Sequence, residues 1–378
     1  MILIAEAEAI FDITHHESKE SMKGRIIFLV LGLIVSVVSL YFAFRGFDLG
    51  GVWDAMLNMR VEFFLLMVVP YVLTFMTKVW RWRVMFHPDE KRVPVGLLTS
   101  SLMISYIPLP FRAGEVARGM IASTRSGIPA PRVFSTIVVE KVLDVLTLLL
   151  FLGISLPFVG LPGNLQGSAI VLGVLVLVMA VFLVALVLRP ELARRLVRLV
   201  AGRLPARLGP RIETAAEQVL QGLAPLSNPS IAARLGLWSL ATWSINSVTV
   251  YLMLLAFNIE VTPMAAMVLV VVTNLSMAVP SAPGYLGPFE AAVVAVLTIL
   301  GQPTNVAQTF AIVYHFIGLV PVATLGVIAA IQQGVGMAAF RGKPDEPATD
   351  GGVGLKPGPT APATPAHQVA GSARDERC

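Results

Sequence analysis

The clearest pattern along the chain is a series of long apolar runs separated by short polar stretches. An α-helix rises about 1.5 Å per residue, so about 20 apolar residues cross the hydrocarbon core of a bilayer. Six runs reach this length, and they lie at 26–44, 61–80, 132–157, 168–188, 235–257 and 305–331. The pattern predicts an all-α polytopic membrane protein with about six spanning helices.

Composition points the same way. Only 13% of the 378 residues are charged and the mean hydropathy is +0.78, whereas an ordinary soluble domain is about one quarter charged. A soluble fold of this composition would have too little polar surface to cover itself.

The basic residues indicate which loops are cytoplasmic, because loops rich in Lys and Arg stay on that side of the membrane. Basic clusters lie at 19–25, 81–92, 112–132, 189–211 and 341–343, while the loop 160–164 is uncharged. We therefore expect a multi-pass protein of the plasma (inner) membrane of a prokaryote, with both termini cytoplasmic and the loop 160–164 external.

Two further apolar stretches cannot cross without placing arginines on the wrong side. Residues 95–111 lie between two basic clusters, and 263–300 must return to the side from which it enters if 305–331 is to deliver the basic tail to the cytoplasm. Both stretches contain Pro and Gly breaks, and non-helical backbone at membrane depth is tolerated only where protein buries it or water reaches it. We predict two re-entrant broken-helix hairpins around a cavity; the alternative is an ordinary pair of kinked helices.

The two hairpins resemble each other. Residues 102–115 read LMISYIPLPFRAGE and residues 274–290 read NLSMAVPSAPGYLGPFE. Twenty-five residues after Glu115 comes Glu140, and twenty-five after Glu290 comes His315, each inside the next span. Since the first hairpin inserts from the cytoplasm and the second from the exterior, we predict an inverted repeat of about 61–157 and 235–331. Transporters built from such repeats bind substrate near the bilayer midplane, at the repeat interface.

The remaining segments flank a membrane transport domain at 25–340. Residues 1–24 form a cytoplasmic N-terminal segment, and 341–378, rich in Pro, Gly, Ala and Thr, is expected to be a disordered cytoplasmic tail. The linker 189–222 is expected to be amphipathic and to lie on anionic lipids of the inner leaflet. Trp80 and Trp82 are expected to be anchors at the membrane interface.

Three stretches carry a resemblance to a known family. They are PLPFRAGEVAR at 108–118, EKVLD at 140–144 and PGYLGPFE at 283–290. They are similar to the membrane region of lysylphosphatidylglycerol synthases, a flippase-like domain that also occurs as stand-alone proteins in bacteria and archaea, and the resemblance covers about 25–335. In the two-domain members of that family a separate soluble domain makes an aminoacylated lipid, and the membrane region is associated with moving it between leaflets. The resemblance therefore implies lipid movement between leaflets. We expect a stand-alone member without the synthase domain or its activity.

The charged residues inside the span 132–157 are the first candidates for a substrate path. Glu140 and Asp144 are one helical turn apart on the same face, with Lys141 beside Glu140. An ionisable group at the middle of a spanning helix costs about 2.5–3.5 kcal/mol, so it is functional or paired. The alternative is a buried structural ion pair, with Lys141 or an arginine of the neighbouring hairpin as the partner.

Other candidates flank the two breaks. Arg112, Glu115 and Arg118 follow the first break, and an arginine fork suits a phosphate, although the arginines could equally set the topology. Glu290 follows the second break, where a carboxylate complements the N-terminus of the returning half-helix; capping alone would explain it. His315 is a path candidate or a hydrogen-bonded packing residue. The rest of the predicted path is Asn274, Pro283, Gly284 and Gly287.

These patterns predict a transporter and not an enzyme. Its cargo is expected to be an anionic or aminoacylated phospholipid, or a polyprenyl-phosphate-linked lipid. The sequence has no phosphate-binding glycine loop and no zinc-protease histidine motif, and its single cysteine, Cys378, excludes a disulfide within the chain. We expect no cofactor, no metal and no nucleic-acid partner. Two alternatives stay open: a lipid transferase with Glu115 or Glu140 as general base, and a non-transporting partner of an envelope-synthesis enzyme. A homo-oligomer also stays open.

Overall fold

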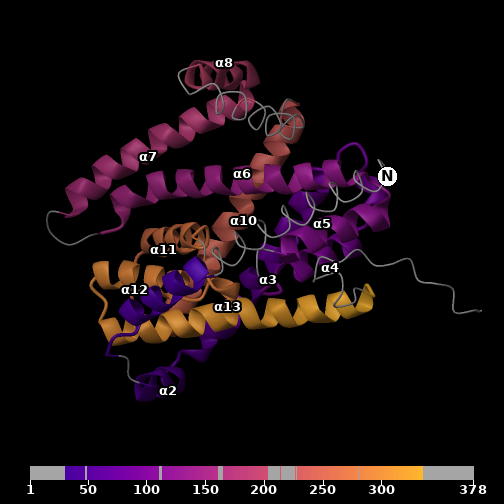
Figure 1. The fold of residues 1–378 in the computed structure, drawn as a ribbon. Helices are drawn as coiled ribbons and strands as arrows, with labels where there is room; N and C mark the ends of the chain where they lie inside the picture. The colour runs from indigo at the N-terminus through magenta and orange to yellow at the C-terminus, as the bar shows by residue number, and fades with distance from the viewer. Residues whose placement is uncertain are drawn as a thin grey trace, which may run out of the picture.

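The computed structural model describes residues 30–46, 49–109, 113–160, 165–202, 213, 226, 228–279 and 281–334. This part of the chain is helical and contains no strand (Figure 1). Its helices are Val30–Ala43, α2 (Leu49–Leu57), α3 (Val61–Val84), α4 (Val95–Ser105), α5 (Ala113–Ser126), α6 (Ala130–Ser155), α7 (Leu165–Leu188), α8 (Pro190–Ala201), α10 (Pro229–Ala256), α11 (Pro263–Ser276), α12 (Pro288–Ile299) and α13 (Thr304–Gln332). Single 3-10 turns are η1 (Glu90–Arg92), η3 (Leu156–Phe158) and η5 (Pro283–Tyr285).

The helices confirm the predicted class, a multi-pass all-α membrane protein. Four are long and apolar enough to cross a membrane: α3, α7, α10 and α13. Helix α6 has 26 residues, about 39 Å at the usual rise, but carries three charged residues near its middle. The first predicted span, 26–44, begins outside the described residues and continues as the helix Val30–Ala43.

Two four-helix halves, α3–α6 and α10–α13, have the same order: a long helix, a short helix, a break, a short helix and a long helix. The contacts across the interface between the two halves are also reciprocal. Helix α3 packs on α10, while α13 packs on the first short helix of the other half, α4, just as α6 packs on α11. In Figure 1 the pair α4–α5 lies at one end of the molecule and α11–α12 at the other, with α6 and α13 running past both. A two-fold relation between the halves produces reciprocal contacts of this kind.

The four short helices contain 11, 14, 14 and 12 residues, and each is shorter than the about 20 residues that a span needs. The breaks lie where Pro and Gly interrupt the apolar runs, as predicted. In the second break, Gly284 and Gly287 have φ values of 81° and 100°, in the left-handed region that glycine enters at little cost.

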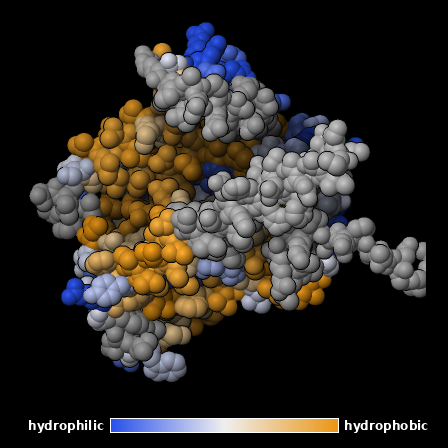
Figure 2. Space-filling model, in the orientation of Figure 1, coloured by the Kyte–Doolittle hydropathy of each residue, from blue (hydrophilic) through white to orange (hydrophobic). Residues whose placement is uncertain are grey.

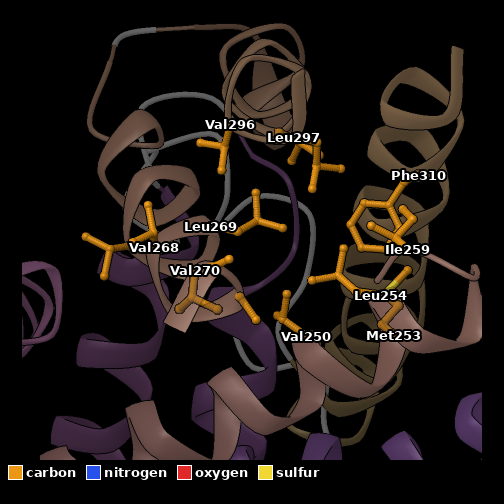
Figure 3. Packing of buried hydrophobic residues seen from close by; sticks show 14 of the residues in the cluster. Val250, Met253, Leu254, Ile259, Val268, Leu269, Val270, Val296, Leu297 and Phe310 are labelled. Carbon is orange, nitrogen blue, oxygen red and sulfur yellow. The ribbon is translucent and has the colours of Figure 1, made fainter. Parts of the chain in front are cut away.

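Each hairpin has its own apolar core. The core around α11 and α12 includes the end of α6 through Leu148 and Phe151, and the core around α4 and α5 includes the end of α13 through Val322 and Ala329. Figure 3 shows the first of these cores, where side chains of α10, α11, α12 and α13 meet. Each long closing helix therefore ties the two halves together.

One glycine sets the spacing between the halves. A Cβ atom added to Gly326 of α13 would lie 2.4 Å from the carbonyl oxygen of Met103 in α4, closer than any van der Waals contact. The two helices touch through backbone at this point. Only glycine permits that approach.

The surface is largely apolar, as membrane-facing helices require. Val171 of α7 and Leu65 of α3 are 70% and 63% exposed. Figure 2 shows hydrophobic residues over most of the surface that is coloured in that view, with hydrophilic residues gathered at the top, over α8. Helix α8 covers 190–201 of the predicted amphipathic linker, and it carries Arg194, Arg195 and Arg198. Most of 203–222, and the termini 1–24 and 341–378, lie outside the described residues.

The tryptophan prediction is wrong for Trp82. Its side chain is 1% exposed, and its indole nitrogen donates to Oγ1 of Thr136 in α6 at 2.8 Å. Trp80, by contrast, is 41% exposed. The two tryptophans lie two residues apart on one helix and so face different sides, one toward α6 and one outward.

Candidate functional site

A cavity of about 300 Å³ lies where the breaks of the two hairpins meet. A Cβ atom added to Gly284 in the second break would lie 3.6 Å from Cβ of Pro108 in the first and 3.4 Å from Leu319 of α13. Long helices of both halves, α3, α6, α10 and α13, complete the wall. Both halves thus contribute to one cavity, at the interface between them.

Two ion pairs of the first half line this cavity. Arg118 of α5 donates to Oε2 of Glu140 in α6 at 3.1 Å, and both residues are buried, with exposed fractions of 2% and 6%. Lys141 donates to Oε1 of Glu115 at 2.8 Å, with both side chains partly exposed. The partner predicted for Glu140 from the neighbouring hairpin is therefore Arg118. Lys141 reaches a different carboxylate.

Asp144 belongs to a third ion pair, with an arginine that the sequence analysis did not place at the site. Arg81 of α3 donates to Oδ1 of Asp144 at 2.6 Å and to Ser239 of α10 at 3.1 Å. The indole of Trp243 donates to the same carboxylate oxygen at 3.0 Å. Glu140 and Asp144 share the predicted helix face and both line the cavity, but each is held by a different arginine.

The second half carries a buried counterpart. Glu290 is the third residue of α12, as Glu115 is of α5. Its Oε2 accepts from the backbone N–H of Gly287 at 2.7 Å, which is the predicted cap, and its Oε1 lies 2.5 Å from Nδ1 of His315. The ring of Phe289 lies 4.5 Å from the His315 ring, centroid to centroid. Glu290 therefore both caps its helix and contacts the next long helix.

The other predicted path residues divide into two groups. Asn274, Gly284 and His315 line the cavity, and Asn274 also donates to the carbonyl of Val270 at 2.8 Å. Gly287 and Glu290 lie behind the wall, with Gly287 packed against the backbone of Ser36. Pro283 begins the turn η5. Arg112 lies outside the described residues.

Lys78 is the main site residue that sequence reasoning missed. It lines the cavity from α3, and its ammonium donates to the hydroxyl of Tyr106 at 2.9 Å. The signal was present, because Lys78 and Arg81 are the two basic residues three positions apart near the end of an otherwise apolar run. Residues at that spacing share a helix face. The sequence analysis uses Arg81 as a topology marker and does not single out Lys78.

In the part of the chain that the structure describes, no three His, Cys, Asp or Glu side chains cluster as a metal site would. The described wall holds paired acids and bases, aromatic rings and amides. Such a wall can bind a charged or strongly polar group.

Comparison with known proteins gives one family and one curated relative. The model of the family described as "Lysylphosphatidylglycerol synthase TM region" matches residues 29–326. The chain is 26% identical over 325 residues to "Glycosyltransferase AglD" of Haloferax volcanii, an alignment that covers 76% of this chain and 51% of the relative. The chain thus spans about half the length of that relative. No solved structure matches.

Proposed function

The chain belongs to the family of lysylphosphatidylglycerol synthase transmembrane regions, and from this premise we propose that it moves a lipid with a charged headgroup between the leaflets of the membrane. The lipid classes are an anionic or aminoacylated phospholipid and a polyprenyl-phosphate-linked lipid. In this proposal the chain carries the lipid and does not change it chemically.

The observation that carries the proposal is the polar cavity at the interface of the two halves. It brings Glu115, Arg118, Glu140, Lys141 and Asp144 together inside an otherwise apolar protein. A charge at the bilayer centre costs about 2.5–3.5 kcal/mol on insertion scales, and a lipid headgroup meets a similar barrier when it crosses unaided. A charged wall that replaces water lowers that barrier.

The size of the cavity fits a headgroup. About 300 Å³ is at the lower end of ligand pockets, which span about 300–1,000 Å³. A whole phospholipid does not fit. In the proposed mechanism the acyl chains stay in the bilayer, alongside apolar outer faces such as that of α7, while the headgroup passes through the protein.

Unequal exposure of the two matching ion pairs supports an alternating mechanism. Lys141 and Glu115 have side-chain exposed fractions of 44% and 23%, whereas His315 and Glu290 have 9% and 5%. Rocking of one repeat against the other exposes a midplane site to one side at a time. In this scheme the described state is open near the first pair and closed at the second.

The proposed orientation follows the basic residues. We place the protein in the plasma membrane with both termini in the cytoplasm, and the hairpins α4–α5 and α11–α12 entering from opposite faces without crossing. The arginine-bearing α8 then lies against anionic lipids of the inner leaflet.

A second function is favoured by the name of the relative. That protein is a glycosyltransferase by name, and this chain covers about half of it. The matched region would then act as the membrane part of enzymes of lipid or glycan synthesis, or as their non-transporting partner. This alternative predicts a cavity that binds lipid without moving it.

Inter-leaflet exchange in liposomes separates the two functions. Purified protein is reconstituted in turn with a headgroup-labelled lipid of each class, an anionic phospholipid such as phosphatidylglycerol, an aminoacylated phospholipid and a polyprenyl-phosphate-linked lipid, and a membrane-impermeant quencher reports the outer-leaflet fraction over time. Transport predicts that the inner-leaflet label becomes accessible faster than in protein-free liposomes, with or without a proton gradient. If no lipid of the three classes moves faster, and only bulk lipid co-purifies, the partner function is the better account.

A further inference from the structure

One charged group in the cavity is not part of any ion pair among the described residues. The ammonium of Lys78 donates to the Tyr106 hydroxyl at 2.9 Å, and a lysine has three N–H donors. Three aromatic rings surround it, those of Phe75, Tyr106 and Trp243, with centroids 5.8, 5.5 and 5.7 Å away. The ammonium lies in an aromatic box open to the cavity.

The neighbouring cations are each matched by a carboxylate. Arg118 pairs with Glu140, Lys141 with Glu115 and Arg81 with Asp144. Asp144, which lies beside Lys78 in the wall, already accepts from Arg81 and Trp243. Lys78 has no carboxylate oxygen within 4 Å in the described part of the chain, so it adds one unmatched positive charge to the wall.

A purely structural role accounts for only part of this arrangement. Lysines near helix ends often extend their stems along apolar surface and place the charge in water, but here the charge lies between helices and among rings. Cation–π attraction within about 6 Å replaces some of the lost hydration. It supplies no acceptor for the remaining N–H donors. Asp144 lies near enough to attract the ammonium, but its hydrogen bonds come from Arg81 and Trp243. An anion in the cavity would be the direct partner that Lys78 lacks among the described residues.

Resting on the proposed transport function, we infer that Lys78 binds the phosphate of the lipid headgroup, with Tyr106 holding the ammonium in place. The recognised chemistry is an anionic phosphate, as found in a phosphodiester lipid or a polyprenyl phosphate. An added lysyl amine would meet only carboxylates already engaged by Arg118, Lys141 or Arg81. The site therefore selects a lipid with net negative charge over a zwitterionic one.

Binding to the detergent-purified full chain tests this inference. Phosphatidylglycerol, phosphatidylcholine, a polyprenyl phosphate and inorganic phosphate are titrated separately, and bound lipid is counted by native mass spectrometry. We expect the two anionic lipids to bind at least about tenfold more tightly than phosphatidylcholine, the range of a lost charged hydrogen bond. Inorganic phosphate that binds as tightly as the lipids would contradict a lipid site and indicate a free-anion site.

The variants separate charge from structure. Lys78→Met should weaken binding of the anionic lipids about tenfold, while Lys78→Arg, which keeps the positive charge but differs in shape, should weaken it less. Lys91→Met, which removes an exposed lysine of the same chain, is the matched control and should change nothing. If Lys78→Met is not monodisperse, Lys78→Gln, which keeps a hydrogen bond to Tyr106 without the charge, replaces it. Anionic-lipid binding within about twofold of the parent in the charge-free variant overturns the inference.

Transport and binding fail in different ways. If the parent protein binds anionic lipid through Lys78 but moves none, the proposed transport is wrong and the binding site stands. If Lys78→Met moves phosphatidylglycerol as fast as the parent with unchanged lipid preference, transport stands and the assignment of Lys78 is wrong.

Discussion

His315 holds its Nδ1 atom 2.5 Å from Oε1 of Glu290, and the same contact recurs in the other half of the molecule. There Lys141 lies 2.8 Å from Glu115. In each half the carboxylate is the third residue of the returning short helix and the base lies in the following long helix. The two halves thus share a contact as well as an order of helices, but only the second pair is buried.

Neutralising the two carboxylates should affect stability unequally. Glu290→Gln leaves a buried histidine without its carboxylate, and an unsatisfied buried group costs about 1–3 kcal/mol. Glu115→Gln breaks a partly exposed pair, and such pairs contribute about 0–1 kcal/mol. Thermal unfolding in one detergent should therefore show a clear drop in Tm for Glu290→Gln and little change for Glu115→Gln. Equal drops would mean that burial does not distinguish the pairs.

The pair Arg118–Glu140 allows a test of structural against functional charge. Glu140→Gln leaves Arg118 buried without a counter-charge, which costs about 3–5 kcal/mol, so Tm should fall. The double change Arg118→Leu with Glu140→Leu removes both charges, and such replacements are often neutral. We expect this double variant to regain stability.

The double variant also reports on transport. If these two charges bind the headgroup, the double variant should show no lipid exchange in liposomes even though its stability has returned. Recovery of both stability and exchange would show that the pair is structural only, the alternative that the sequence left open.

Two glycines of α13 give a matched packing test. A Cβ at Gly326 meets the Met103 carbonyl, whereas a Cβ at Gly318 has no atom within 4 Å. Gly326→Ala should lower stability by about 1–3 kcal/mol through overpacking. Gly318→Ala should be neutral or slightly stabilising, because alanine favours helix. A neutral Gly326→Ala would contradict the backbone contact between α13 and α4.

The topology proposal is tested by cysteine labelling. Thr124, near the end of α5, and Asn305, near the start of α13, are both exposed and lie beside corresponding connections in the two halves. With Cys378 replaced by serine, single cysteines at these positions should react with an impermeant reagent from opposite faces of the membrane, Thr124→Cys from the cytoplasm. Reaction from the same face would remove the inverted arrangement.

The sequence predicted the helices well because their signal is local. Apolar runs of spanning length became helices, and the Pro and Gly breaks separated the short helices. Helix α2 was missed because residues 49–57 contain Gly50, Gly51 and Asp54 and form no long apolar run. Trp82 was misplaced because one-dimensional position does not tell which face of a helix meets another helix.

The sequence predicted that charged residues of α6 belong to the site, but not which residues they pair with. Glu140 and Asp144 stood out because charges are rare inside apolar spans. Their partners could not be read from the chain, since Arg81 lies 63 residues from Asp144 and only the packing of α3 against other helices brings it there. The spacing argument paired Glu140 with His315, whereas by contact Lys141, one residue later, occupies the corresponding place. Helix α5 is two residues longer than α12 and the connection after it is one residue shorter, and together these differences account for the shift of one residue.

The central claim is that the headgroup passes through the cavity between the two hairpins, and a disulfide that joins the breaks of the hairpins tests it most directly. Cβ atoms at positions 108 and 284 would lie 3.6 Å apart, within the about 3.5–4.5 Å that a disulfide needs. Pro108→Cys with Gly284→Cys, in a chain with Cys378→Ser, is reconstituted in liposomes, and exchange of labelled phosphatidylglycerol is measured oxidised and then reduced, with each single cysteine variant as a control. We predict that oxidation lowers exchange to the rate of protein-free liposomes and that reduction restores it. Exchange at the same rate in the oxidised and reduced states would contradict passage through the cavity between the hairpins.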